Sequence, residues 1–109
     1  MGSPKSIVGS FYCSYNKLTT LEGGPKSVGG AFSCSDNNLT TLEGSPQSVG
    51  GYFNCGYNKL TTLEGCPKSV SGNFIFYGNP IYNQLGSIDY NSYIKQINRD
   101  KILNELLNR

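Results

Sequence analysis

The chain of 109 residues contains no histidine and no tryptophan, and charged residues make up only 15% of it. Without histidine, the commonest metal ligand and general base is missing, and no acidic pair is present for acid–base catalysis. We therefore predict a protein that is not an enzyme and that needs no cofactor or metal. With a net charge of +2, no basic face for nucleic acid is predicted either. Basic residues cluster loosely at Lys95, Arg99, Lys101 and Arg109.

Long hydrophobic stretches are also lacking. No run of about 18 apolar residues occurs, so no segment is expected to span a membrane. A basic stretch followed by an apolar one, as in a secretory leader, is not found, so no signal peptide is expected.

What the chain does contain is a 21-residue repeat. Its first three copies share twelve of 21 letters, in the pattern S-[IV]-x-G-x-F-x-C-x-x-N-x-L-T-T-L-E-G-x-P-x. A fixed period in the twenties is typical of a solenoid, in which each coil buries its apolar face against its neighbours. We assign a solenoid to residues 1–86 and a helical cap to 87–109. The repeats span 6–26, 27–47, 48–68 and 69–89.

Each repeat begins with apolar residues that alternate with variable ones, as in Phe11-Tyr12-Cys13. This period of two predicts a short, half-buried strand, and stacking the coils predicts a four-stranded parallel sheet. Phe and Cys should point inward, so Cys13, Cys34 and Cys55 should form a buried, inert ladder. Cys66 occupies a turn position and should be exposed.

An asparagine follows each strand, at Asn16, Asn37, Asn58 and Asn79. Its amide offers donors and an acceptor to the backbone of its own and the next coil, so we predict a structural asparagine ladder. Two leucines then return to the core before Glu-Gly-x-Pro turns the chain. This return segment is too short for a full helix, so it should be extended or 3₁₀.

The pattern F-x-C-x-x-N-x-L, as in Phe53–Leu60 followed by Leu63, resembles the leucine-rich-repeat family over residues 6–85. Phe and Cys replace two inward leucines of the family pattern L-x-x-L-x-L-x-x-N-x-L. The resemblance implies an α/β-type, right-handed coil. The variant with the inner Cys is similar to repeat proteins of bacteriophage and bacterial genomes, which implies a structural or assembly protein, cytoplasmic or virion-associated.

The two ends of the solenoid should differ. No cap precedes the first coil, which leaves a candidate assembly surface at Ile7, Phe11, Leu18 and Leu21. At the other end, Ser87 is a candidate N-cap for a helix that begins near Ile88, and the helix face with Tyr93 and Ile94 should cover the fourth coil. A second apolar group projects nearly opposite to that face: Ile102, Leu103, Leu106 and Leu107. Either the helix breaks near Asn98 into a two-helix cap, or this group docks on a partner or a second copy.

The outward positions of the sheet differ most between repeats and are rich in Tyr and Asn, which suits contact with a protein or a glycan. Equally, a soluble sheet face needs such residues. The candidate partner-binding residues are Tyr12, Ser33, Tyr52, Asn54, Tyr57, Ile75 and Tyr77. We expect a non-enzymatic protein-interaction or assembly module that self-associates or binds a protein through its first coil or its C-terminal helix. A glycan-binding module that uses the sheet face is the alternative.

Overall fold

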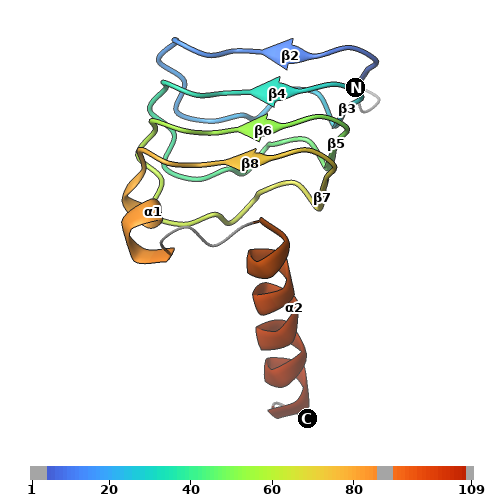
Figure 1. Cartoon of the computed structure of the whole chain (residues 1–109), viewed down its shortest axis with the longest axis vertical. Coiled ribbons are helices and arrows are strands. Elements are labelled where there is room, and N and C mark those ends of the chain that lie inside the picture. Colours follow the sequence, from blue (N-terminus) through green and yellow to red (C-terminus); the bar gives the residue numbers. More distant parts are fainter. Residues whose placement is uncertain (1–4, 86–89, 108–109) are drawn as a thin grey trace.

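The computed structural model describes residues 5–85 and 90–107, which form a β-solenoid followed by a helix (Figure 1). Coils one to four comprise residues 6–26, 27–47, 48–68 and 69–85. Each coil contributes two short strands. The strands are β1 (Ser6–Ile7), β2 (Phe11–Tyr12), β3 (Ser27–Val28), β4 (Phe32–Ser33), β5 (Ser48–Val49), β6 (Phe53–Asn54), β7 (Ser69–Val70) and β8 (Phe74–Ile75).

The strands form two parallel four-stranded sheets, in the orders β1-β3-β5-β7 and β2-β4-β6-β8. Partners in register are always 21 residues apart, as with Phe11 and Phe32. The predicted solenoid and its parallel sheet are confirmed. The second sheet was not predicted, because each of its strands contains a single apolar residue, as in Ser27–Val28, and no alternating pattern marks it. It forms because Val28 and Val49 point inward and are 2% and 1% exposed.

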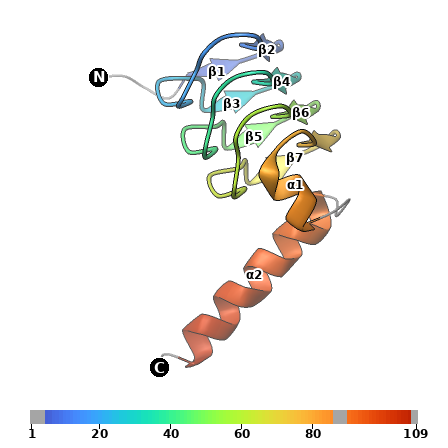
Figure 2. The same cartoon turned by 90° about the vertical axis from the view of Figure 1, so that its left-hand side faces the viewer.

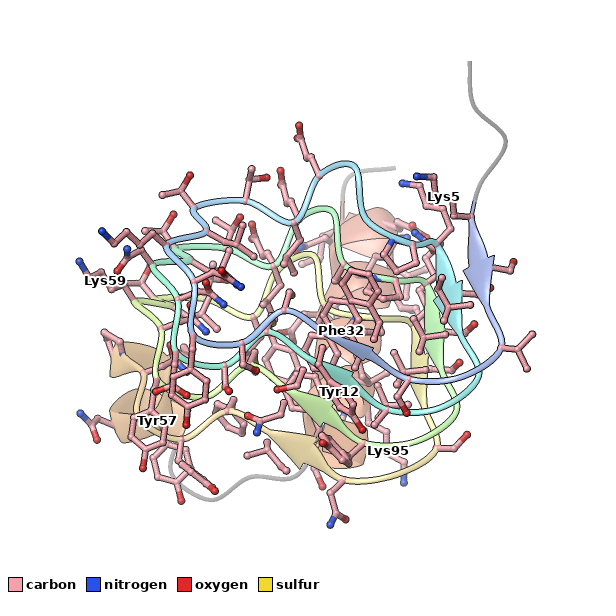
Figure 3. The ribbon with its side chains drawn as sticks, turned by 90° about the horizontal axis from the view of Figure 1, so that it is seen from above. Lys5, Tyr12, Phe32, Tyr57, Lys59 and Lys95 are labelled. Atoms are coloured by element: carbon pink, nitrogen blue, oxygen red, sulfur yellow. The ribbon has the colours of Figure 1, made fainter. Side chains whose placement is uncertain are left out.

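Stacked phenylalanines and leucines fill the core. The rings of Phe11, Phe32, Phe53 and Phe74 follow one another at centroid distances of 5.5, 5.5 and 5.1 Å, and Figure 3 shows Phe32 inside the coil. The return leucines of coils two and three are 0–1% exposed. The apolar sequence positions therefore build one continuous core.

The asparagine ladder is confirmed, but its direction differs from the prediction. The Asn58 amide donates to the carbonyls of Cys55 and Gly56 in its own coil and of Cys34 in the preceding coil. Its Oδ1 accepts a hydrogen bond from Leu39 N, also in the preceding coil. From Asn37 onward, each asparagine side chain thus links its coil to the one before it and not to the next, because the side chain leans back along the stack.

The residue before each asparagine adopts a left-handed backbone conformation. The φ angles are 59° at Tyr15, 58° at Asp36, 54° at Tyr57 and 81° at Gly78. Only glycine takes this conformation without strain. Since three non-glycine residues adopt it, the turn geometry and not the side chain sets the backbone at this position.

Two helices follow the last strand. Helix α1 (Pro80–Leu85) replaces the return segment of coil four, and its Pro80 suits the first helical position. Helix α2 (Tyr90–Leu107) is continuous, so the alternative of a break near Asn98 is wrong. The suggested cap at Ser87 and start at Ile88 lie outside the described residues. Neither helix of the described ranges is long and apolar enough to cross a membrane.

Helix α2 packs on the solenoid only near its beginning. Tyr93 packs against the core cluster, and Ile94 lines a hollow beside the turn that contains Leu63 and Cys66. The rest of α2 extends away from the coils, on the side opposite to coil one (Figures 1 and 2). The predicted cap is therefore partial, and most of the helix projects.

Candidate functional site

The coil-one end of the solenoid has an apolar hollow. It is about 260 Å³ in volume, and Glu22 is the one charged residue among those that line it. We call it the coil-one hollow. Its lining residues are Phe11, Cys13, Leu18, Thr20, Leu21, Glu22, Gly23, Gly24, Pro25 and Phe32.

Coil one buries its core residues less completely than coils two and three. Phe11 and Leu18 are half-buried, whereas Phe53 and Leu60 at the same repeat positions are 0% exposed. Ile7 and Cys13 are half-buried as well. Leu21 is 6% exposed and belongs to the buried core cluster, so the prediction that it would lie open is wrong. The hollow thus exposes core residues of one coil.

The backbone of coil one also presents hydrogen-bonding groups without a partner. In coil two, the carbonyls of Ala31 and Ser33 accept from Phe11 N and Cys13 N of coil one, at 2.8 Å each. The equivalent carbonyls of coil one belong to Ser10 and Tyr12, and no described residue donates to them. Such an open strand edge favours pairing or coverage.

Val8 is an exposed apolar residue that sequence reasoning missed. It is 94% exposed at the corner between β1 and β2. Coils two to four carry Gly29, Gly50 and Ser71 at this position, and a Cβ on Gly29 would lie 3.2 Å from the Val8 carbonyl carbon. Coils two to four therefore have a small residue at this position, where each contacts the preceding coil. The departure of Val8 from Gly and Ser was the signal available in the sequence.

A second apolar surface lies on the projecting part of α2. Ile102, Leu103, Leu106 and Leu107 are 57%, 49%, 55% and 78% exposed, and we call these four residues the α2 stripe. Lys95 and Arg99 line a groove together with Ile102 and Leu103. The prediction of an uncovered apolar group on this helix therefore agrees with the structure.

The predicted sheet-face residues fall into two groups. Tyr12 is 63% and Tyr52 38% exposed, and hydrogen bonding with Tyr12 raises the pKa of the Tyr52 phenol. These two tyrosines come from coils one and three and span coil two. Ser33 of coil two is only 6% exposed, and its hydroxyl lies 2.7 Å from that of Ser14. The candidacy of Ser33 as a contact residue is wrong, since its neighbours enclose it.

The second group lies toward coil four. The ring of Tyr77 makes edge contacts with those of Tyr57 and Tyr82, at 5.7 and 6.4 Å. Tyr57 and Tyr77 are about half exposed, at 56% and 49%, and Tyr57 points away from the core in Figure 3. Ile75 and Asn54 are half-buried. Of the seven predicted residues, the four tyrosines are therefore the exposed ones.

The cysteines are unsuited to chemistry. Cys34 and Cys55 are fully buried, and burial raises the pKa of both thiols. Cys66 is half-buried against the core, so its predicted exposure is wrong. Burial raises its pKa to about 11. Within residues 5–85 and 90–107, no cluster of Cys, Asp or Glu is arranged to hold a metal ion.

No protein-family model, curated protein or solved structure matches this chain. The interpretation of its function therefore rests on the geometry of its surfaces.

Proposed function

We propose that the chain is a non-enzymatic protein-interaction or assembly module that binds a protein through coil one. The observation that carries this proposal is the coil-one hollow, where half-buried Phe11 and Leu18 lie beside an open strand edge. The resemblance to leucine-rich-repeat proteins, including those of phages and bacteria, agrees with such a role.

The energetics favour coverage of this end. Full burial of a Phe or Leu side chain contributes about 1.5–3 kcal/mol relative to exposure. A protein that completes the burial of Ile7, Phe11 and Leu18 therefore gains on the order of a few kcal/mol. Donors that reach the carbonyls of Ser10 and Tyr12 add to this gain. The hollow thus offers both an apolar contact and directional polar groups.

The alternative, a glycan site on the sheet face, has less support. A sugar needs hydroxyl and amide groups that are available to it. Here the hydroxyl of Ser14 lies within hydrogen-bonding distance of those of Ser33 and Ser35, and the Asn54 side chain accepts a hydrogen bond from Gly56 N. Because these groups bond within the protein, the aromatic rings remain the main contribution of this face.

Site-specific photo-crosslinking in cells that make the protein tests the proposal. A photoreactive phenylalanine analogue replaces Thr20 beside the hollow, Thr41 at the same repeat position in coil two, or Tyr52 on the sheet face. We expect a crosslinked protein, which includes a second copy of the chain, from position 20 and not from position 41. Products only from position 52 favour the sheet face, and no product from position 20 refutes binding at coil one.

A further inference from the structure

If coil one is the binding end, as proposed above, the occupant of the coil-one hollow can also be inferred. We propose that the α2 stripe of a second copy of this chain occupies the coil-one hollow. The protein then carries both halves of its own contact, an apolar hollow on the solenoid and an apolar ridge on the helix. Association through two different surfaces is heterologous; it closes into a dimer when two copies exchange helices and otherwise extends into a chain of copies.

The helix of the same chain is excluded by position. Coil one and the free end of α2 lie at opposite ends of the molecule along its long axis (Figures 1 and 2), and the molecule extends 40 Å along that axis. Ile102, Leu103, Leu106 and Leu107 therefore reach a coil-one hollow only on another molecule.

A helix already lies beside the equivalent turn of coil three. There, Ile94 of α2 lines a hollow with Leu63, Cys66 and Pro67. These solenoid residues occupy the same repeat positions as Leu21, Gly24 and Pro25, which line the coil-one hollow. An aliphatic side chain from a helix thus already rests beside this turn, and Leu103 or Leu106 provides a similar side chain in the second copy.

The charges of the two surfaces are complementary. Glu22 is the one charged residue that lines the coil-one hollow, and Lys95 and Arg99 are the charged residues that line the groove beside the α2 stripe. Opposite charges at the rim of an apolar contact steer association and fix its orientation. A stripe docked in parallel against a second stripe would instead bring Lys95 and Arg99 of the two copies toward each other.

A further coil is a poorer occupant than a helix. Where one coil rests on another, the second coil carries Gly29, Gly50 or Ser71. Coil one carries the bulky Val8, 94% exposed, at this position, so a coil of the same kind seated on it would meet a branched side chain. A docked helix does not continue the coil, so its backbone does not have to pass over Val8 at the corner between β1 and β2. The same obstacle disfavours pairing of two coil-one ends.

The test uses two variants, each with a matched control. Thr20→Arg places a long cation in the coil-one hollow, facing Lys95 and Arg99 of the incoming helix. Its control is Thr41→Arg, at an exposed residue in the same repeat position. The two substitutions remove equivalent hydrogen bonds, which Glu22 N and Glu43 N donate to the hydroxyls of Thr20 and Thr41. Leu103→Glu places a charge in the α2 stripe. Its control is Asn104→Glu, which places the same charge at the neighbouring exposed residue.

Sedimentation velocity at micromolar concentration measures the association, and circular dichroism verifies that each variant is folded. We expect the wild type and both controls to associate, and Thr20→Arg and Leu103→Glu to be monomers, with association weakened tenfold or more. A mixture of these two variants should form a 1:1 complex, because Thr20→Arg retains an intact stripe and Leu103→Glu an intact hollow. Only pairing of hollow with stripe gives this complementation.

Three results would overturn the inference: a monomeric wild type, association that survives Leu103→Glu, or a mixture that stays monomeric. These outcomes differ from failure of the proposed function. If photo-crosslinking at position 20 captures a different protein while the wild type is monomeric, coil one is a binding end but α2 is not its occupant. If position 20 captures nothing, coil one is not a binding end at all.

Discussion

The asparagine ladder allows a sharp test of what holds the coils together, through the substitution Asn58→Ala. Asn58 is 7% exposed, and its side chain makes four hydrogen bonds. The bonds are not equally important. The carbonyls of Cys34, Cys55 and Gly56 each accept a second hydrogen bond, from Asn37, Asn79 and Asp36 N respectively. Leu39 N has Asn58 Oδ1 as its only partner among the described residues.

Asn58→Ala therefore leaves one buried backbone N–H unsatisfied. Such a group costs about 1–3 kcal/mol, and the lost hydrogen bonds add to this cost. We expect the free energy of unfolding to fall by about 3 kcal/mol. Asn16 is the matched control, because its amide donates to Cys13 and Ser14 while no described residue donates to its Oδ1. Asn16→Ala should cost about 1 kcal/mol or less.

Urea unfolding monitored by circular dichroism measures both variants. The difference in free energy follows from the shift in midpoint at unchanged slope. Equal losses for Asn16→Ala and Asn58→Ala would refute the reasoning, because the direction of the ladder would then have no energetic consequence. A loss below about 1 kcal/mol for Asn58→Ala would show that Leu39 N finds another partner.

Three further predictions concern the backbone and the buried thiols. At Tyr15, φ is 59° and the side chain is 82% exposed. Tyr15→Gly should leave the free energy of unfolding unchanged or raise it by up to about 1 kcal/mol, whereas Tyr15→Val introduces a β-branched residue and should lower it. The urea midpoints of the two variants decide this. Gly23 and Gly44 have similar φ values of 89° and 92°, but a Cβ meets nothing within 4 Å at Gly23 and the Leu21 carbonyl carbon at 2.6 Å at Gly44. Gly44→Ala should therefore lower the thermal midpoint clearly more than Gly23→Ala. Burial raises the pKa of the Cys66 thiol from 9.0 to about 11, so this thiol ionises at lower pH in the unfolded chain than in the folded one. Its contribution to stability is therefore complete below pH 9 and is lost as the pH rises from 9 toward 11. Wild type should thus lose more stability than Cys66→Ala between pH 8 and pH 11 in urea titrations, and equal losses would contradict this.

Much of the fold could be predicted from the sequence because each coil repeats the same contacts. Phe53, Cys55 and Leu60 recur every 21 residues, and an apolar residue at a fixed period has to face a common core. The second sheet could not be predicted in this way. A strand of two residues, such as Ser48–Val49, shows no alternation, and it becomes visible only when the stacked coils are paired.

The candidate site was predictable only in part, because exposure depends on neighbours that are distant in sequence. Ser33 was expected to face outward by its place in the strand, yet residues from coils one and three enclose it. Leu21 was expected to lie open, yet it is part of the buried core cluster. The exposure of Leu103 and Leu106 was one of two alternatives that the sequence left open, because a break near Asn98 would have folded these residues back as part of a cap.

The direction of the ladder explains why coil one is the end with open hydrogen-bond acceptors. Every asparagine side chain from Asn37 onward accepts hydrogen bonds from backbone amides of the coil before it. Asn16 has no described coil before it, so its Oδ1 and the carbonyls of Ser10 and Tyr12 all lie open at the same end. Because these acceptors lie beside the half-buried Phe11 and Leu18, coverage of coil one satisfies apolar and polar groups together. For this reason the proposed contact is placed there and not on the sheet face.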